Sequence, residues 1–488
     1  YFWAINSDKD LTINSKLFAS QHPLFLGEYK QAFKNSRLTL DFGFTEGFKK
    51  TSDTKKSGDK SHIFLNILKN FNKSETINQN IELNLQHVSN KKYLKLYKID
   101  SNLVDYETEV LENFIDYSLI NDDKNHFLSI NASSYTTLAD SYNDKYEYIL
   151  PEINYEKQLF NDKFGYGNIK SNLKVHNYDT NKFKKTLINN FNWELDRPFS
   201  EQRYKGKFLT KLKNISYEYE NVEGFKNSAT NELFGAVGYL ASLDLYKNTN
   251  EGSNHLLTPK ILFKYAPNYM RKEDGEYNLV GKNLFSLDRL QSEQNFEGGT
   301  NLTVGFDYEI NDSFNQTNFS IGQIISEKKN NKNMPDTSSL DNRFSDVVGS
   351  LNHKRGDNFA LNYNYSIDQN LKETNFNEVS VDYINDNFKF NINFLEEEKK
   401  SGDNEYIKTS FKYNKGDSGV LTFSNKRNLI TSSSEFYDLS YEYINDCLRA
   451  GLYYRREFYN DSELEAENSL MFKITLSSFG SVNTPSFN

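Results

Sequence analysis

Side chains that could carry chemistry are few in this sequence, and their spacing does not build a catalytic site. The seven histidines are scattered, with no two at metal-ligand spacing: His22, His62, His87, His126, His176, His255 and His353. No nucleophile elbow, phosphate-binding loop or zinc-protease motif is present. The sequence therefore predicts no enzyme, no cofactor and no metal site.

The single cysteine, Cys447, is the remaining residue with reactive chemistry. One cysteine cannot form a disulfide within the chain, and in an oxidising compartment a leftover cysteine indicates pairing outside it. The residue follows Asn445 and Asp446, which are typical of a tight turn, and this position favours such pairing. The alternative is a small apolar residue at the start of a strand, and position alone leaves both open.

Strand-length segments that alternate apolar and polar residues dominate the chain. Residues 302–310 read Leu-Thr-Val-Gly-Phe-Asp-Tyr-Glu-Ile, and the same alternation recurs over residues 359–367 and 388–394. A period of two places the apolar set on one face of a β-strand. Such segments, roughly ten residues long, are typical of a transmembrane β-barrel whose apolar side faces lipid.

The connections in the C-terminal third alternate between short and long. Tight turns are predicted at residues 385–387, 414–417 and 445–446, and longer polar connections at residues 396–404, 425–435 and 457–468. Asn, Asp and Gly at the tight ends tolerate the left-handed backbone of short hairpins. Short periplasmic turns and long outer loops are typical of outer-membrane barrels. On this count the last strand runs inward and the C-terminus lies in the periplasm.

Composition agrees with a barrel that has a wet interior. Aromatic residues make up 15% of the chain, yet hydrophobic residues reach only 37% and the mean hydropathy is -0.76. No stretch approaches the roughly 18 apolar residues of a spanning helix, which excludes a helical inner-membrane protein. The net charge of -9 argues against a nucleic-acid partner, because phosphate binding needs a basic face.

Short motifs follow one another along the chain in a specific order. They contain Pro259, Asp288, Arg289, Gly322, Gln323, Ser345, Asp346, Gly349 and Asp446. The chain also opens on Tyr-Phe-Trp-Ala-Ile-Asn, and Asp446 stands next to Cys447. Each motif is weak alone, but their order and spacing resemble the barrel of the LptD family, the lipopolysaccharide-assembly proteins of the outer membrane.

This resemblance implies an all-β fold, a large antiparallel transmembrane β-barrel. At roughly 18–20 residues per strand and connection, the 488 residues give about 24–26 strands. We expect the barrel over residues 1–477 and a periplasmic C-terminal tail over residues 478–488. The family's N-terminal β-jellyroll and most or all of its first barrel strand are expected to be missing. The family often carries adjacent cysteines where this chain has Cys447 followed by Leu448, which leaves a single bridge to the periplasmic domain.

The resemblance also implies a transport route and its partners. In the family, the sugar of lipopolysaccharide enters the barrel lumen while the lipid leaves sideways where the first and last strands meet. The candidate lipid-facing side of this gate is on the last strand: Leu470, Phe472, Ile474 and Leu476. Expected partners are lipopolysaccharide, a plug lipoprotein similar to LptE, the periplasmic lipopolysaccharide bridge, which binds through the missing domain, and the barrel-assembly machinery of a Gram-negative bacterium.

Two other classes of protein compete with this interpretation. A passive porin or substrate-gated importer shares the strand pattern, but a porin of 16–18 strands would need far longer loops, and an importer has a plug domain before its barrel. A soluble or surface-exposed β-rich binding protein predicts equal turn lengths at both ends and no lipid-facing aromatic face.

Overall fold

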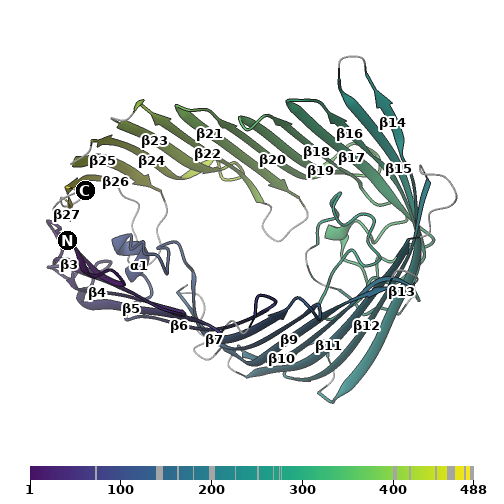
Figure 1. Ribbon diagram of the computed structural model, residues 1–488, viewed down its shortest axis with the longest axis horizontal. Coiled ribbons are helices and arrows are strands. Elements are labelled where there is room, and N and C mark those ends of the chain that lie inside the picture. Colours follow the sequence, from purple (N-terminus) through teal and green to yellow (C-terminus); the bar gives the residue numbers. More distant parts are fainter. Residues whose placement is uncertain are drawn as a thin grey trace.

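One antiparallel sheet of 27 strand segments curves into a ring (Figure 1). The computed structural model describes the chain except residues 72–73, 139–146, 162–163, 180, 197–203, 226, 250–251, 268, 274, 276, 399–403, 417–418, 446–447, 459–467, 477–479 and 484–488. Each strand pairs with its neighbour in sequence, except that β13 and β14 both pair with β15. The predicted all-β fold and large antiparallel barrel architecture are confirmed.

The strands are long and closely follow one another. The first half of the sheet contains β1 (Phe2–Asn6), β2 (Lys9–Lys16), β3 (Leu24–Phe33), β4 (Ser36–Gly47), β5 (Ser57–Asn70), β6 (Ile77–Val88), β7 (Val110–Asn121), β8 (His126–Thr137), β9 (Glu147–Asn161), β10 (Gly165–Tyr178), β11 (Lys182–Asp196), β12 (Tyr204–Glu220) and β13 (Thr230–Leu243). The second half contains β14 (Leu245–Asn248), β15 (Asn254–Tyr265), β16 (Asn301–Asn311), β17 (Asn315–Ser326), β18 (Val347–Arg355), β19 (Phe359–Ile367), β20 (Thr374–Ile384), β21 (Phe388–Glu397), β22 (Asn404–Asn414), β23 (Gly419–Asn428), β24 (Ser433–Ile444), β25 (Leu448–Glu457), β26 (Asn468–Leu476) and β27 (Gly480–Asn483). The helical elements are α1 (Tyr93–Tyr97) and a 3-10 turn, η1 (Asp336–Ser338).

On β15 and β4, large apolar side chains are exposed on the outer face, and polar side chains are buried on the inner face. On β15, Ile261 and Phe263 are 49% and 52% exposed, whereas Lys264 is completely buried. On β4, Phe42 and Phe44 are exposed, and Thr45 is buried. An exposed apolar outer face over a polar inner face is the pattern expected of a sheet whose outer side meets lipid.

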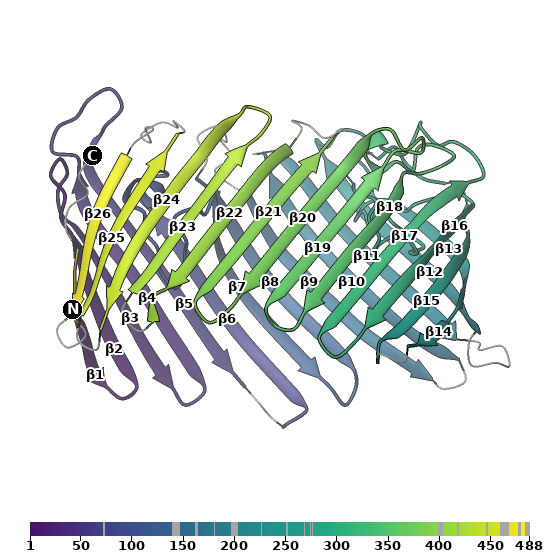
Figure 2. The same ribbon diagram turned by 90° about the horizontal axis from the view of Figure 1, so that it is seen from above.

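Tight turns close neighbouring strands, and the strands are tilted across the ring (Figure 2). At the short end, the side chain of Asn385 closes its turn by accepting hydrogen bonds from the backbone N–H groups of Asn387 and Phe388, at 2.9 and 2.8 Å. Asp312 accepts from Phe314 and Asn315 in the same way, at 2.7 Å each.

Two of the long connections are shorter than predicted. β21 continues through Glu397, and only residues 429–432 separate β23 from β24. The expectation of loops over residues 396–404 and 425–435 was therefore wrong in extent. The ladder is made by backbone groups, so strands continue as polar ribbons after the apolar alternation ends. The expected tail over residues 478–488 contains the short strand β27, which pairs back onto β26.

The first and last strands lie side by side but are not joined by a ladder. β1 pairs with β2, and β26 pairs with β25 and β27. Among the described residues, no ladder links β1 or β2 to β26 or β27, although β2 and β27 are in contact. We call this unpaired junction the seam. No helix in the described part of the chain is long and apolar enough to cross a membrane.

Candidate functional site

Two long connections fold into the ring instead of extending away from it (Figure 1). They are residues 266–300, between β15 and β16, and residues 327–346, between β17 and β18, and together we call them the luminal lobe. Buried apolar residues of the lobe, Leu287 and Phe296, pack against β11, β12 and β13 through Ile188, Ile215 and Phe234. The lobe is therefore a packed part of the inner wall.

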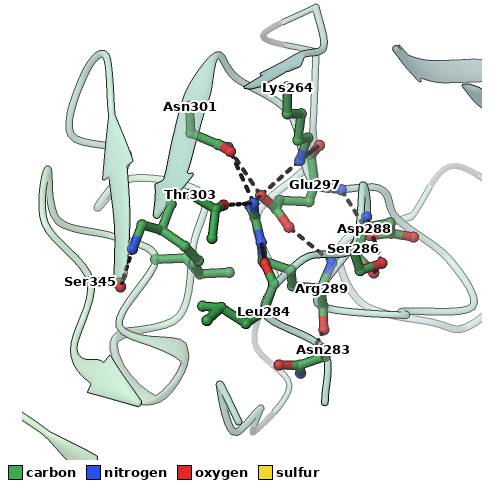
Figure 3. A network of polar contacts seen from close by, with 12 residues as sticks. Lys264, Asn283, Leu284, Ser286, Asp288, Arg289, Glu297, Asn301, Thr303 and Ser345 are labelled. Atoms are coloured by element: carbon green, nitrogen blue, oxygen red, sulfur yellow. Dashed lines mark hydrogen bonds and ion pairs between the residues drawn. The ribbon is translucent and has the colours of Figure 1, made fainter. Parts of the chain in front are cut away.

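A buried charge network holds the first connection of the lobe to the wall (Figure 3). The carboxylate of Glu297 contacts the ammonium of Lys264 on β15, with 2.7 Å between Nζ and Oε1. The same carboxylate pairs with the guanidinium of Arg289 and accepts the backbone N–H of Arg289 at 2.9 Å. All three residues are at most 3% exposed.

The remaining donors of Arg289 are also used. Its Nη2 donates to Asn301 Oδ1 at 3.0 Å and to Thr303 Oγ1 at 2.8 Å, and its Nε donates to the carbonyl of Leu284 at 3.0 Å. The planar guanidinium fork suits this role because it can donate in several directions at once. A buried charge is stable only when it is paired and hydrogen-bonded in this way. Arg289 thus joins the lobe to β16.

Asp288, the neighbour of Arg289, connects the lobe to β12. Its carboxylate lies 3.2 Å from the ammonium of Lys211 on β12 and accepts the backbone N–H of Glu297 at 3.2 Å. Lys213, also on β12, donates to the backbone carbonyls of Ser292 and Asn295. The lobe is therefore held from β12 as well as from β15 and β16.

A second polar cluster fixes the connection between β17 and β18. Gln323 donates to the carbonyl of Ser345 at 2.9 Å, and the Ser345 hydroxyl accepts the backbone N–H of Ile324 at 3.0 Å. The carboxylate of Asp346 accepts hydrogen bonds from Ser366 on β19 and Asn375 on β20, at 2.9 and 2.6 Å. Motif residues that are separate in sequence therefore meet at one wall of the lumen.

The glycines of the motifs mark places where chains approach closely. Gly322 lies opposite Gly305 in the ladder, and a Cβ atom there would be 2.5 Å from Leu284 Cδ2 of the lobe. A Cβ atom on Gly349 would be 2.6 Å from the backbone oxygen of Ser320. Only glycine allows these approaches without displacing backbone.

Pro259 has a role in the sheet and does not join the lobe. It lies on β15 opposite the break between β13 and β14, where Asp244 leaves the ladder and accepts a hydrogen bond from Thr258 at 3.2 Å. A residue without an N–H group suits a strand position beside such a break.

The other candidate residues lie at the seam or outside the described chain. Leu470 and Phe472 on β26 are 39% and 37% exposed, Ile474 is half-buried, and Leu476 pairs with Leu448. Their part in a gate stays a prediction. Asp446 and Cys447 lie outside the described residues.

Sequence reasoning missed the lysines of the network, and it quoted Glu297 within a motif without assigning it a role. Lys211, Lys213 and Lys264 stand on the polar faces of their strands, where each resembles an ordinary lumen-lining charge. Glu297 stands in the Glu-Gly-Gly-Thr stretch at 297–300, and this stretch was the available signal for a special carboxylate.

The model of the family described as LptD, LPS transport system D, matches residues 65–446, well over half of the chain. The chain belongs to the LptD family. No curated protein sequence matches it. The match covers the whole luminal lobe and all of β6 to β24. The function of the family is lipopolysaccharide transport at the outer membrane.

The charge network makes the luminal lobe sensitive to acid. Burial alone would raise the pKa of the Glu297 carboxyl, but Arg289 and Lys264 lower it below its ordinary value of 4.5. Because the pKa of Glu297 is lowered in the folded protein, its ion pairs with Arg289 and Lys264 stabilise the lobe above pH 4.5. This stabilisation is lost as the pH falls through the lowered pKa. We expect protease cleavage within residues 266–300 to rise over this acidic range, measured by limited proteolysis with an acid-active protease. Glu297→Gln should flatten that rise, and an unchanged profile in this variant would contradict the assignment.

Proposed function

We propose that this chain forms the membrane barrel through which lipopolysaccharide enters the outer leaflet, with sugar in the lumen and lipid leaving through the seam. The observation that carries the proposal is the junction of β1 and β2 with β26 and β27, where no ladder is formed among the described residues. Sideways exit from a closed barrel would require breaking a row of backbone hydrogen bonds in lipid, which is costly. A seam without such a row opens at lower free energy.

The two halves of the substrate explain why a seam is needed. Each acyl CH₂ group is worth about 0.8 kcal/mol when kept out of water, so the lipid must stay in an apolar medium throughout. The sugar needs water or hydrogen bonds for the same journey. A polar lumen with a lateral opening gives each half its own medium.

The inner wall offers hydrogen bonds suited to sugar. A cavity of about 650 Å³ lies between strands β9 to β12 and the luminal lobe. Its lining includes Asn172, Asn190, Asn192, Lys170 and Glu156. Amide and charged side chains of this kind bind sugar hydroxyl groups, and they favour a lumen path along this wall.

The finer arrangement follows from the same proposal. The short turns and the C-terminus would lie in the periplasm, and Cys447 would pair with a cysteine of the periplasmic domain. A plug lipoprotein similar to LptE would occupy lumen space beside the luminal lobe. The periplasmic bridge would bind through the N-terminal jellyroll, and the barrel-assembly machinery would insert the barrel.

The test places a photo-crosslinking residue at Phe472 of the full-length gene product in its native outer membrane. We expect a lipopolysaccharide adduct on immunoblots that depends on energised transport. Phe263 on β15 is the matched control, because it is also an exposed phenylalanine but lies across the ring from the seam (Figure 1). If assembled protein gives no adduct at Phe472 while small solutes leak through, a passive porin or substrate-gated importer explains the barrel better.

A further inference from the structure

The connection between β6 and β7, residues 89–109, also folds into the ring, and it lies next to the seam (Figure 1). It contains α1, whose Tyr93, Leu94 and Tyr97 are buried together with Ile99. We call residues 89–109 the seam segment. Its apolar side packs on Leu24 of β3, Phe64 of β5 and Leu111 of β7, so it is firmly seated on the side of the first strands. 

Polar contacts also hold the seam segment to the first strands, which we call its near side. The ammonium of Lys16 on β2 donates to the backbone carbonyls of Tyr97 and Lys98, at 3.1 Å each. These carbonyls end α1, where a cation is favourable. Asn102 donates to the carboxylate of Glu28 on β3 at 2.5 Å.

The same segment reaches the strands on the other side of the seam. Lys98 Nζ lies 3.4 Å from the hydroxyl oxygen of Ser469 on β26. The guanidinium of Arg455 on β25 donates to the Tyr106 hydroxyl at 2.6 Å and lies 5.5 Å from the centre of its ring. Asp438 on β24 orients this guanidinium, at 3.4 Å from its Nε. Strands that do not pair with each other are thus bridged from the lumen.

A lysine lies on each side of the seam. Lys16 on β2 interacts unfavourably with Lys473 on β26. This repulsion raises the free energy of a closed seam, and the seam has no ladder among the described residues to offset it. Besides the contact between β2 and β27, the seam segment supplies contacts that oppose this repulsion.

We propose that residues 89–109 are a luminal latch that holds the seam closed and releases β25 and β26 when lipid leaves. The inference rests on the proposed lateral exit and adds its regulation. An apolar cluster holds the near side of the segment to the first strands. Its far side, toward β25 and β26, is held by a few polar contacts. The latch therefore stays with the first strands and detaches from Tyr106–Arg455 and Lys98–Ser469.

One test loosens the latch in the full-length protein in cells. Arg455→Gln removes the cation that Tyr106 binds, and we expect a several-fold rise in sensitivity to a large glycopeptide antibiotic that an intact outer membrane excludes. Arg456→Gln is the matched control, because Arg456 is the exposed neighbour on the same strand. Heat-modifiable migration on gels verifies that both barrels are folded. Equal sensitivity of two folded variants would overturn the latch.

A second test locks the latch with a bismaleimide cross-linker. Cysteines at Tyr106 and Arg455 join the far side, and cysteines at Asn102 and Glu28 join the near side. We expect the far-side link to reduce the appearance of new lipopolysaccharide at the cell surface more than tenfold and the near-side link to leave it unchanged, with reagent-treated parent protein as background. Transport at the parental rate through a fully far-side-linked barrel would overturn the latch.

The two proposals fail in different ways. If the parent protein gives a lipopolysaccharide adduct at Phe472 but the far-side link does not slow transport, lateral exit stands and the latch is wrong. If Phe472 gives no adduct, lateral exit is wrong. The antibiotic test of Arg455→Gln still decides whether residues 89–109 hold the seam closed, because entry of the antibiotic does not depend on lipopolysaccharide transport.

Discussion

Arg289→Ala is expected to release the luminal lobe and to destabilise the barrel by about 3–5 kcal/mol, the usual range for breaking a buried ion pair by removal of one partner. Alanine leaves Glu297 buried with Lys264 as its remaining charged partner, and it removes the donors to Asn301 and Thr303. The measurement is urea-induced loss of heat-modifiable migration for the detergent-solubilised protein, together with protease cleavage within residues 266–300.

An exposed ion pair provides the control for Arg289→Ala. Lys182 and Asp179 are 2.7 Å apart, and both side chains are 38% exposed. Lys182→Ala should therefore change the stability by less than about 1 kcal/mol. Arg289→Lys should fall between the two, because lysine keeps the charge but lacks the planar fork. Equal effects of Arg289→Ala and Lys182→Ala would show that the buried network does not hold the lobe.

The strands and their faces could be predicted because they depend on local pattern. The alternation over residues 302–310 corresponds to β16, and the predicted turn at 385–387 joins β20 to β21. The ends of long strands were less predictable. Polar ladders such as Glu396 with Glu405 continue β21 and β22 past the apolar pattern, and sequence periodicity does not record backbone pairing.

The interior could be predicted only in part. Asp288, Arg289, Gln323 and Ser345 were recognised through motifs, but nothing local indicates that they meet on one wall. Lys264 is buried because residues 266–300, which follow the end of β15, fold back over it. The role of residues 89–109 at the seam was missed for a similar reason: its contacts with Arg455 and Ser469 join parts of the chain more than 300 residues apart.

Gly322→Val is expected to disrupt the packing of the luminal lobe against β17. A Cβ atom at this position would be 2.7 Å from the backbone oxygen of Val304 and 2.5 Å from Leu284 Cδ2, distances too short for real contacts. Overpacking of this kind lowers stability by about 1–3 kcal/mol or more. We expect valine to reach the upper end of this range, because its branched side chain forces the strand backbone to move. We expect a lower yield of folded barrel by heat-modifiable migration and less lipopolysaccharide at the cell surface.

Variants of neighbouring residues separate the two causes of this effect. Gly281→Ala is the control, because a Cβ atom there would meet its nearest neighbour, Ser350 Oγ, at an ordinary 3.6 Å. Leu284→Ala removes the side-chain clash but leaves the oxygen of Val304 in place. We therefore expect the combination of Gly322→Val with Leu284→Ala to recover only part of the folded yield. Full recovery would mean that the lobe alone limits position 322, whereas no recovery would assign the whole effect to the ladder between β16 and β17.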